Sequence, residues 1–170
     1  MLRICLFVQL ITVFSVSAQT KFDQCPGFPS PVQVAFNDCI EQPCDLIRGT
    51  NGTTTITFKA TSDSRKLKAS VRGSFFGIGV DHNLGDQGKN GCKYLKSGSC
   101  PLVNGNQYVY QIVDLVKPSE IKVNGVQLTY KLFDENKKII TCFQLSANVV
   151  DRKGEADEED EDEDYDDDEE

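Results

Sequence analysis

The chain has 170 residues, including 18 Lys or Arg, 26 Asp or Glu, one histidine, seven cysteines and no tryptophan. A domain of this length can bury a core of its own, and a single histidine, His82, excludes metal sites that need several imidazole ligands. The net charge of −8 averages two unlike parts, because residues 155–170 carry 14 acidic and no basic side chains, whereas residues 1–154 carry 18 basic and 12 acidic ones.

Residues 1–18 have the pattern of a secretory signal peptide. A basic residue precedes an apolar run over residues 4–14, and Val16 and Ala18 are the small residues that signal peptidase requires. The alternative is a membrane anchor, but the apolar run over residues 4–14 is too short, because crossing a bilayer core of about 30 Å takes about 20 apolar residues. We therefore predict cleavage after Ala18 and a secreted, extracellular protein.

Short segments of the remaining chain alternate apolar and polar residues with a period of two, and none shows a sustained helical period. Turn-forming residues separate these segments, and Asn124-Gly125 is either a two-residue hairpin or a bulge. Six to eight strands at this spacing predict an all-β fold, an antiparallel β-sandwich. The strand-like segments are residues 32–36, 53–58, 67–71, 76–80, 108–112, 126–132 and 140–143.

Six cysteines remain after Cys5 leaves with the signal peptide: Cys25, Cys39, Cys44, Cys92, Cys100 and Cys142. An even number in an oxidising compartment predicts three disulfides, for which the sequence alone allows about fifteen pairings. A zinc site is the alternative, but the chain lacks a CxxC pair and a second histidine. Asn51-Gly52-Thr53 is a glycosylation sequon, so we predict a glycan on Asn51.

The C-terminal residues 153–170 contain nothing to bury, and their like charges repel, so we expect a disordered acidic tail. It is either a solubilising extension or something more specific: a weak calcium buffer, a shield over the basic domain, or a docking segment for a basic partner. The tail lacks the glycine and glutamate spacing of an EF-hand loop, which argues against a specific calcium site.

No arrangement of side chains in the sequence indicates catalysis. Gly77-Ile78-Gly79 lacks the third glycine of a dinucleotide loop, and Ser119-Glu120-Ile121-Lys122 lacks the companion motifs of its catalytic string. The basic residues between 65 and 72 have no aromatic residues among them to stack on bases. We therefore predict a protein that is no enzyme, binds no nucleic acid, and uses no cofactor or metal.

Several motifs follow one another in a characteristic order between residues 22 and 147. They are Cys39-x4-Cys44-Asp45-Leu46-x-Arg48-Gly49, Ile56-Thr57-Phe58, Gly91-Cys92-x7-Cys100-Pro101-Leu102, Tyr108-x-Tyr110 and Ile140-Thr141-Cys142-Phe143. Each motif is weak alone, but together they resemble the ML (lipid-recognition) domain family, most closely its Niemann-Pick type C protein 2 and group 2 mite allergen branch. The likeness spans nearly all of the expected domain, residues 19–152.

The resemblance implies an immunoglobulin-like sandwich of two antiparallel sheets, with disulfides Cys25–Cys142, Cys39–Cys44 and Cys92–Cys100. It also implies a non-enzymatic monomer that holds one apolar ligand, a sterol or fatty acyl lipid, in an apolar slot between the sheets. The guest would complete the core, since each Å² of apolar surface removed from water contributes about 25 cal/mol. Delivery of the lipid would involve docking to a membrane or a receptor.

The family pattern and strand parity together assign the residues of the slot. Phe76, Ile78 and Val80 are the strongest candidates, because their strand borders the mouth of the slot in relatives. For each residue the alternative is ordinary core packing without ligand contact. The predicted slot residues are Ile56, Phe58, Phe76, Ile78, Val80, Tyr110, Ile112, Val116, Val126, Leu128 and Tyr130.

The mouth departs from the pattern of the sterol-carrying members. Val80-Asp81-His82-Asn83 stands where they have a Pro-rich apolar stretch, and Tyr130 replaces a tryptophan. This more polar mouth argues against cholesterol specifically. His82 is either a solvated loop residue or a pH-dependent gate.

The leading hypothesis is a carrier of a sterol or related lipid that is secreted or works in the lumen of endosomes and lysosomes. One alternative is an extracellular carrier of fatty acids or small semiochemicals. Another is an innate-immunity protein that recognises bacterial lipids or a receptor.

Overall fold

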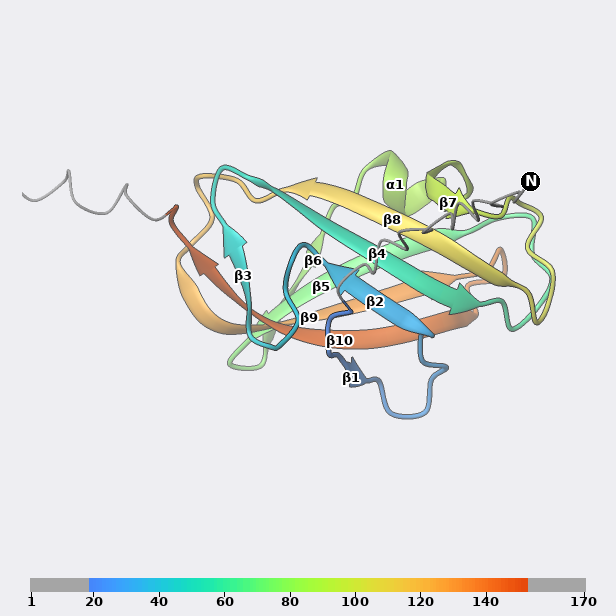
Figure 1. Cartoon of the computed structure of the whole chain (residues 1–170), viewed down its shortest axis with the longest axis horizontal. Coiled ribbons are helices and arrows are strands. Elements are labelled where there is room, and N and C mark those ends of the chain that lie inside the picture. Colours follow the sequence, from blue (N-terminus) through green and yellow to red (C-terminus); the bar gives the residue numbers. More distant parts are fainter. Residues whose placement is uncertain (1–18, 153–170) are drawn as a thin grey trace, which may run out of the picture.

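The computed structural model describes residues 19–152, so the predicted signal peptide and acidic tail lie outside the described residues. Two β-sheets face each other (Figure 1). Sheet A has the order β1 (Asp23–Gln24), β10 (Ile139–Val150), β9 (Val123–Phe133), β5 (Lys68–Phe75) and β6 (Ile78–His82), and β3 (Cys44–Ile47) also pairs with β10. Sheet B has the order β2 (Gln33–Phe36), β4 (Asn51–Lys59), β8 (Gln107–Leu115) and β7 (Leu95–Ser97).

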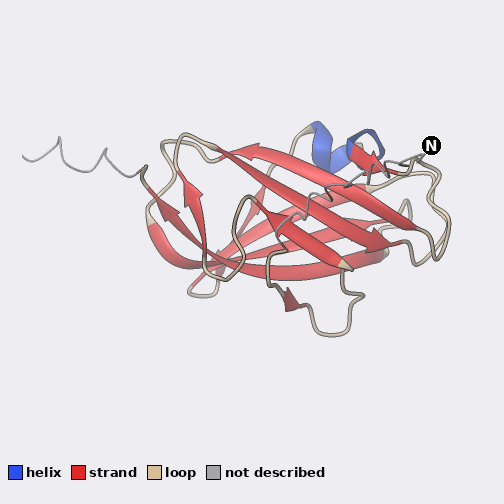
Figure 2. Cartoon of the chain, in the orientation of Figure 1, coloured by secondary structure: helices blue, strands red, loops and turns tan. Residues whose placement is uncertain are grey.

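The prediction of a sandwich of two antiparallel sheets is confirmed, with one parallel pair at the edge. That pair joins β3 to the end of β10, with Ala147 opposite Cys44 and Val150 opposite Ile47. Helical structure within residues 19–152 is limited to α1 (Asp86–Lys89), which packs against β5, and the 3-10 turn Gly91–Tyr94, which leads directly into β7; both are blue in Figure 2. The period-two pattern therefore identified the fold class correctly.

The structure decides between the two alternatives for Asn124-Gly125 and shows that Phe76 lies in a turn. Asn124-Gly125 is a bulge within β9, because Val123 pairs with Val149 and Val126 with Ala147 around a register shift, and Gly125 has a φ of 77°. Phe76, expected in a strand, instead forms with Gly77 the two-residue turn between β5 and β6. Both turn residues have positive φ, as tight hairpins require.

The disulfides are the three that the resemblance implies: Cys25–Cys142, Cys39–Cys44 and Cys92–Cys100. The first joins residues 117 positions apart in the sequence. In the chain-entropy model, closing such a loop stabilises the fold by roughly 4–5 kcal/mol, because it constrains the unfolded chain. The other two close short loops of 5 and 8 positions.

The described residues also bear on membrane spans and metal sites. No helix between residues 19 and 152 is long and apolar enough to cross a bilayer. No cluster of three or more His, Cys, Asp or Glu suited to a metal ion occurs over the same residues.

Candidate functional site

A cavity of about 360 Å³ lies between the two sheets toward one end of the sandwich. Its volume falls in the range of roughly 300–1,000 Å³ that small-molecule sites occupy. Sheet A contributes Leu46, Val71, Gly73, Val80, Val123, Val126, Leu128, Tyr130 and Val149 to its walls. Sheet B contributes Phe36, Gly52, Thr54, Ile112, Asp114 and Leu115 to the opposite wall, and the β8–β9 connection adds Val116, Glu120 and Ile121.

The cavity exists because side-chain size falls along the inward faces of the strands. The buried residues of β4 are, in order toward the cavity, Phe58, Ile56, Thr54 and Gly52. On β5 of the other sheet, Gly73 stands between Leu128 of β9 and Val80 of β6. Sandwich cores are normally filled by interdigitating side chains about 10 Å deep, so glycine and threonine at these positions leave the space empty.

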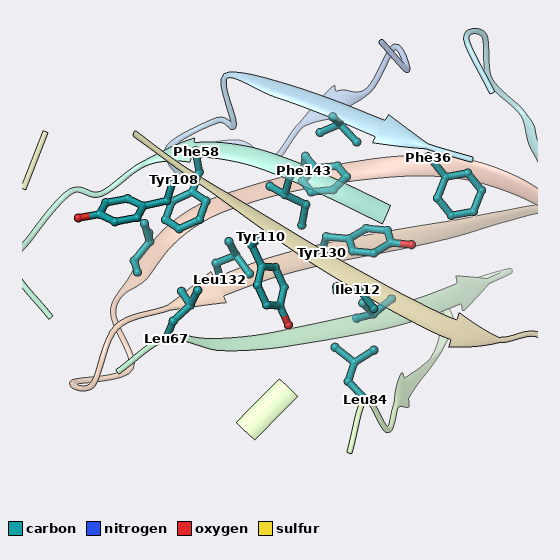
Figure 3. Close-up of a cluster of buried hydrophobic side chains, with 14 of the residues drawn as sticks. Phe36, Phe58, Leu67, Leu84, Tyr108, Tyr110, Ile112, Tyr130, Leu132 and Phe143 are labelled. Atoms are coloured by element: carbon teal, nitrogen blue, oxygen red, sulfur yellow. The ribbon is translucent and has the colours of Figure 1, made fainter. Parts of the chain in front are cut away.

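The opposite end of the interior is solid. Phe58 is fully buried and stacks on Tyr108 with ring centroids 5.8 Å apart, and Leu67 and Leu132 pack in the same cluster. Figure 3 shows where these side chains lie: Phe58, Tyr108 and Leu67 are at one side of the cluster, and the cavity-lining residues Tyr130, Ile112 and Leu84 are toward the other.

The structure brings six of the eleven predicted slot residues to the cavity wall: Val80, Ile112, Val116, Val126, Leu128 and Tyr130. Ile56, Phe58 and Tyr110 also point inward, but they are fully buried core residues that do not line the cavity. Contact of any of these residues with a ligand stays a prediction.

Phe76 and Ile78 do not line the cavity, contrary to the prediction. Phe76 is 90% exposed and Ile78 is 75% exposed, because both lie at the tip of the β5–β6 hairpin. Parity assigns a face to a strand residue, but Phe76 belongs to a turn and Ile78 lies beyond the cavity lining. Val80 lines the mouth while 68% of it remains exposed.

Sequence reasoning missed the cavity residues that have little or no side chain. A Cβ built on Gly73 would lie 3.8 Å from side-chain atoms of both Val126 and Leu128, and Gly52 meets Leu46 and Phe36 at 3.8–4.0 Å. A glycine inside a strand is a known signal of close approach by a ligand or another chain segment, and it could have identified both positions.

Two hydroxyl groups are set into the otherwise apolar wall. Thr54 Oγ1 donates a hydrogen bond to the Tyr130 hydroxyl at 3.3 Å, and both residues are buried. Burial raises the pKa of Tyr130 to about 12, against the lowering effect of the hydrogen bond from Thr54. The phenol is therefore neutral at physiological pH and leaves a hydroxyl proton that can be donated to a guest.

The mouth carries acidic groups and one imidazole. His82 Nε2 of β6 lies against a carboxylate oxygen of Asp114 on β8, so this pair connects the two sheets. Asp81 and Glu120 line the same opening, and the described lining includes neither lysine nor arginine. Asp81 is paired with Arg72 at 2.8 Å. The rim is thus rich in carboxylates around an apolar interior.

Backbone and side-chain hydrogen bonds hold the β8–β9 connection in place as one lip of the mouth. Gly49 N donates to Val116 O at 2.7 Å, and Arg48 Nη1 donates to Glu120 O at 3.2 Å. Arg48 also pairs with Asp151, which Lys122 contacts from the other side. This lip, including the exposed Ile121, is therefore fixed to β3 and to the end of β10.

Comparison with known protein families identifies the family of this two-sheet, three-disulfide domain. The family model for the ML domain matches residues 19–149. The chain belongs to the ML-domain family. ML domains are lipid-binding domains without enzymatic activity, which agrees with the lack of a catalytic arrangement in the sequence.

Individual ML proteins show the extent of the similarity. The chain is 29% identical over 139 residues to "NPC intracellular cholesterol transporter 2" of Danio rerio, covering 81% of this chain and 89% of that protein. It is 31% identical over 94 residues to "Mite group 2 allergen Der f 2" of Dermatophagoides farinae, covering 55% and 61%. A crystal structure of a Niemann-Pick type C2 protein from Japanese carpenter ant has a TM-score of 0.67 at 20% identity, covering 76% and 99% of the two chains, and shows the shared fold.

Proposed function

We propose that this ML domain carries one apolar lipid, a sterol or a closely related neutral molecule, in the cavity between its sheets. The observation that supports this function best is the apolar cavity of about 360 Å³ in a sandwich whose other end is solid. An apolar guest there replaces missing side chains and gains about 25 cal/mol per Å² withdrawn from water, before the costs of association.

The rim favours a neutral head group over a carboxylate. Three carboxylates, Asp81, Asp114 and Glu120, line the opening, and its described lining contains no lysine or arginine. Asp81 is paired with Arg72 and Asp114 lies against His82, so Glu120 is the carboxylate of this lining without an ion-pair partner among residues 19–152. An ionised fatty acid would bring a further negative charge next to it, and like charges repel. A sterol hydroxyl carries no charge and can hydrogen-bond to these oxygens. This charge pattern supports a sterol-like ligand over a free fatty acid.

The β5–β6 hairpin supports loading from a lipid bilayer. Phe76, Ile78 and Val80 expose their side chains along the hairpin, and Val80 also lines the cavity. Contiguous exposed apolar residues beside a binding site are typical of surfaces that meet membranes or proteins. We propose that this hairpin touches the bilayer while the lipid passes through the mouth.

The site of action is extracellular or the lumen of endosomes and lysosomes. Three disulfides are typical of an oxidising compartment. The relative of Danio rerio is named an intracellular cholesterol transporter, which is in keeping with a luminal carrier.

The exposed position of Asn51 at the start of β4 leaves room for the predicted glycan. We take the carrier to be a monomer, because residues of one chain are sufficient to line the cavity.

Equilibrium titration with a fluorescent sterol, followed by displacement with unlabelled ligands, tests this function. We expect saturable 1:1 binding of the sterol, and weaker displacement by a free fatty acid than by its methyl ester. Glu120→Gln removes one rim carboxylate and should strengthen fatty-acid binding, whereas Asp38→Asn removes an exposed carboxylate outside the cavity and should change nothing.

Two results would count against the assignment. Binding of free fatty acid more tightly than sterol would support the fatty-acid carrier instead. Binding of bacterial lipopolysaccharide with no measurable sterol binding would support recognition of bacterial lipids.

A further inference from the structure

A second depression in the protein is lined by many basic side chains, whereas the lipid cavity is mainly apolar. It has a volume of about 860 Å³ and lies between the segment before β5, α1 with the 3-10 turn that follows it, and the β9–β10 turn. We call it the basic groove. Its lining includes six exposed cationic side chains and no carboxylate: Arg65, Lys66, Lys68, Lys89, Lys93 and Lys137.

Most of these cations have no acidic partner in the folded domain. Arg65 lies 3.7 Å from Glu135, and Lys93 lies 3.4 Å from Asp86. Among residues 19–152, no carboxylate forms an ion pair with Lys66, Lys68, Lys89 or Lys137, which line the groove from three separate chain segments. Several like charges held close together repel one another, so this surface is suited to a polyanion.

The chain itself supplies a polyanion of the required kind. Residues 155–170 contain 14 Asp or Glu and no basic residue. We propose that this acidic segment binds in the basic groove of its own domain, where it neutralises the lysines that no folded carboxylate reaches. Attachment to the same chain raises the effective concentration of the segment to the order of millimolar, so weak individual contacts suffice.

The distances allow this contact. The groove borders Phe133, which pairs with the first residue of β10, whereas the chain leaves the domain at the opposite end of β10. The 12 residues of β10 span roughly 40 Å at about 3.3 Å per residue. Residues 152–170 can extend over roughly 60 Å, so the last ten residues, nine of them acidic, can reach the groove.

Docking there would place the acidic segment next to the lipid cavity. His82, the last residue of β6, and Leu84, in the connection from β6 to α1, line both the basic groove and the cavity. A segment lying in the groove would therefore pack against one wall of the mouth. The proposal does not depend on which lipid the cavity holds.

Lysine acetylation measured site by site by mass spectrometry tests the proposal on the full-length chain. The comparison is a full-length variant in which the acidic residues of 155–170 are changed to Asn and Gln. At low salt, we expect Lys66, Lys68 and Lys89 to react at least threefold more slowly in the native chain than in this variant. The matched control is Lys59, Lys96 and Lys117, exposed lysines outside the groove, which should react equally in both.

A salt dependence and a charge-reversal variant test whether the protection comes from charges in the basic groove. The difference should disappear near 0.5 M salt, where charges are screened within a few Å. Triple substitution of Lys66, Lys68 and Lys89 by Glu should abolish the protection of the remaining groove lysine Lys137, whereas the same changes at Lys59, Lys96 and Lys117 should preserve it. Every groove lysine is exposed, so these variants should fold.

Three results would overturn the proposal. The first is equal acetylation of the groove lysines in the native and neutralised chains. The second is protection that increases with protein concentration, because this indicates binding between molecules. The third is elution of both chains from a heparin column at the same salt concentration, because this indicates a groove open to an external polyanion.

Discussion

The two ends of the sandwich interior are built from the same strands but have opposite properties. On β4, Phe58 fills one end and stacks on Tyr108, whereas Gly52 and Thr54 border an empty space at the other. β9 likewise contributes buried Leu132 to the solid end and Val126 to the cavity. The solid end supplies the packing that stabilises the fold, and the hollow end can therefore be left to a ligand.

Shortening one side chain at each end of the interior should give the largest difference in stability that we expect, because only the solid end contributes close packing. Phe58→Ala leaves a cavity in a well-packed cluster and should lower the free energy of unfolding by about 3–5 kcal/mol. Thr54→Ala, on the same face of β4, removes a hydrogen bond beside existing empty space and should cost only about 1 kcal/mol. Urea unfolding with intact disulfides measures both, and equal losses would contradict the division into a solid and a hollow end.

Alkaline pH should destabilise the hollow end through Tyr130. Burial raises its pKa from 10.0 to about 12, so above pH 10 the unfolded chain loses a proton that the folded chain keeps. The stability that this gives is fully present below pH 10 and is lost as pH rises to 12. At about 1.4 kcal/mol per pKa unit, the loss is roughly 2–3 kcal/mol.

Tyr130→Phe provides the comparison for that loss. The variant should be slightly less stable at pH 7, because Thr54 loses its partner, but its unfolding free energy should fall less between pH 10 and 12. Burial also raises the pKa of Tyr110, so a slope should remain in both proteins. Parallel pH profiles of the two proteins would show that the Tyr130 phenol is not buried as described.

Filling the hollow end should weaken lipid binding without unfolding the domain. Val126→Trp places a large side chain in the cavity and should reduce sterol affinity at least tenfold, about 1.4 kcal/mol. Gln127→Trp adds the same group on the outer face of β9, since neighbouring strand residues point to opposite faces. Fluorescence titration should find the control unchanged, and a loss shared by both variants would argue against the cavity as the binding site.

The β5–β6 hairpin should affect transfer more than affinity, which is the smallest effect that we expect at equilibrium. Val80→Asp adds a charge to the mouth and should weaken binding in solution a few-fold. Phe76→Asp changes a residue outside the cavity lining and should leave affinity in solution unchanged but slow the uptake of sterol from vesicles. A loss of affinity in Phe76→Asp as large as in Val80→Asp would contradict this separation.

The sequence predicted the solid parts of this molecule better than the empty ones. Alternation of apolar and polar residues predicted both sheets, and the motifs predicted the disulfides, because side chains and cysteines leave visible patterns. The parity of β8 and β9 predicted an inward face with Ile112, Val126 and Leu128, which line the cavity in the structure. An apolar pattern cannot tell a packed residue from one that lines a cavity, so Ile56, Phe58 and Tyr110 were grouped with the wall.

The remaining differences have specific physical causes. Gly52 and Gly73 line the cavity by lacking a side chain, and such positions are invisible to a search for apolar faces. Phe76 was assigned to a strand because it alternates with Ile78 and Val80, whereas in the structure it adopts a φ of 47° in the hairpin turn, a value rare for phenylalanine. The basic groove was missed because its cations come from separate segments that only the fold brings together.

Native mass spectrometry of the protein, purified without lipid extraction, tests most directly whether the hollow end holds a lipid. Gly73→Leu directs its side chain into the cavity between Val126 and Leu128, while Ser74→Leu adds the same group on the other face of β5. We predict one lipid-sized mass adduct per chain in the native protein and in Ser74→Leu, and none in Gly73→Leu. An adduct that persists in Gly73→Leu, or is absent from all three proteins, would contradict the account.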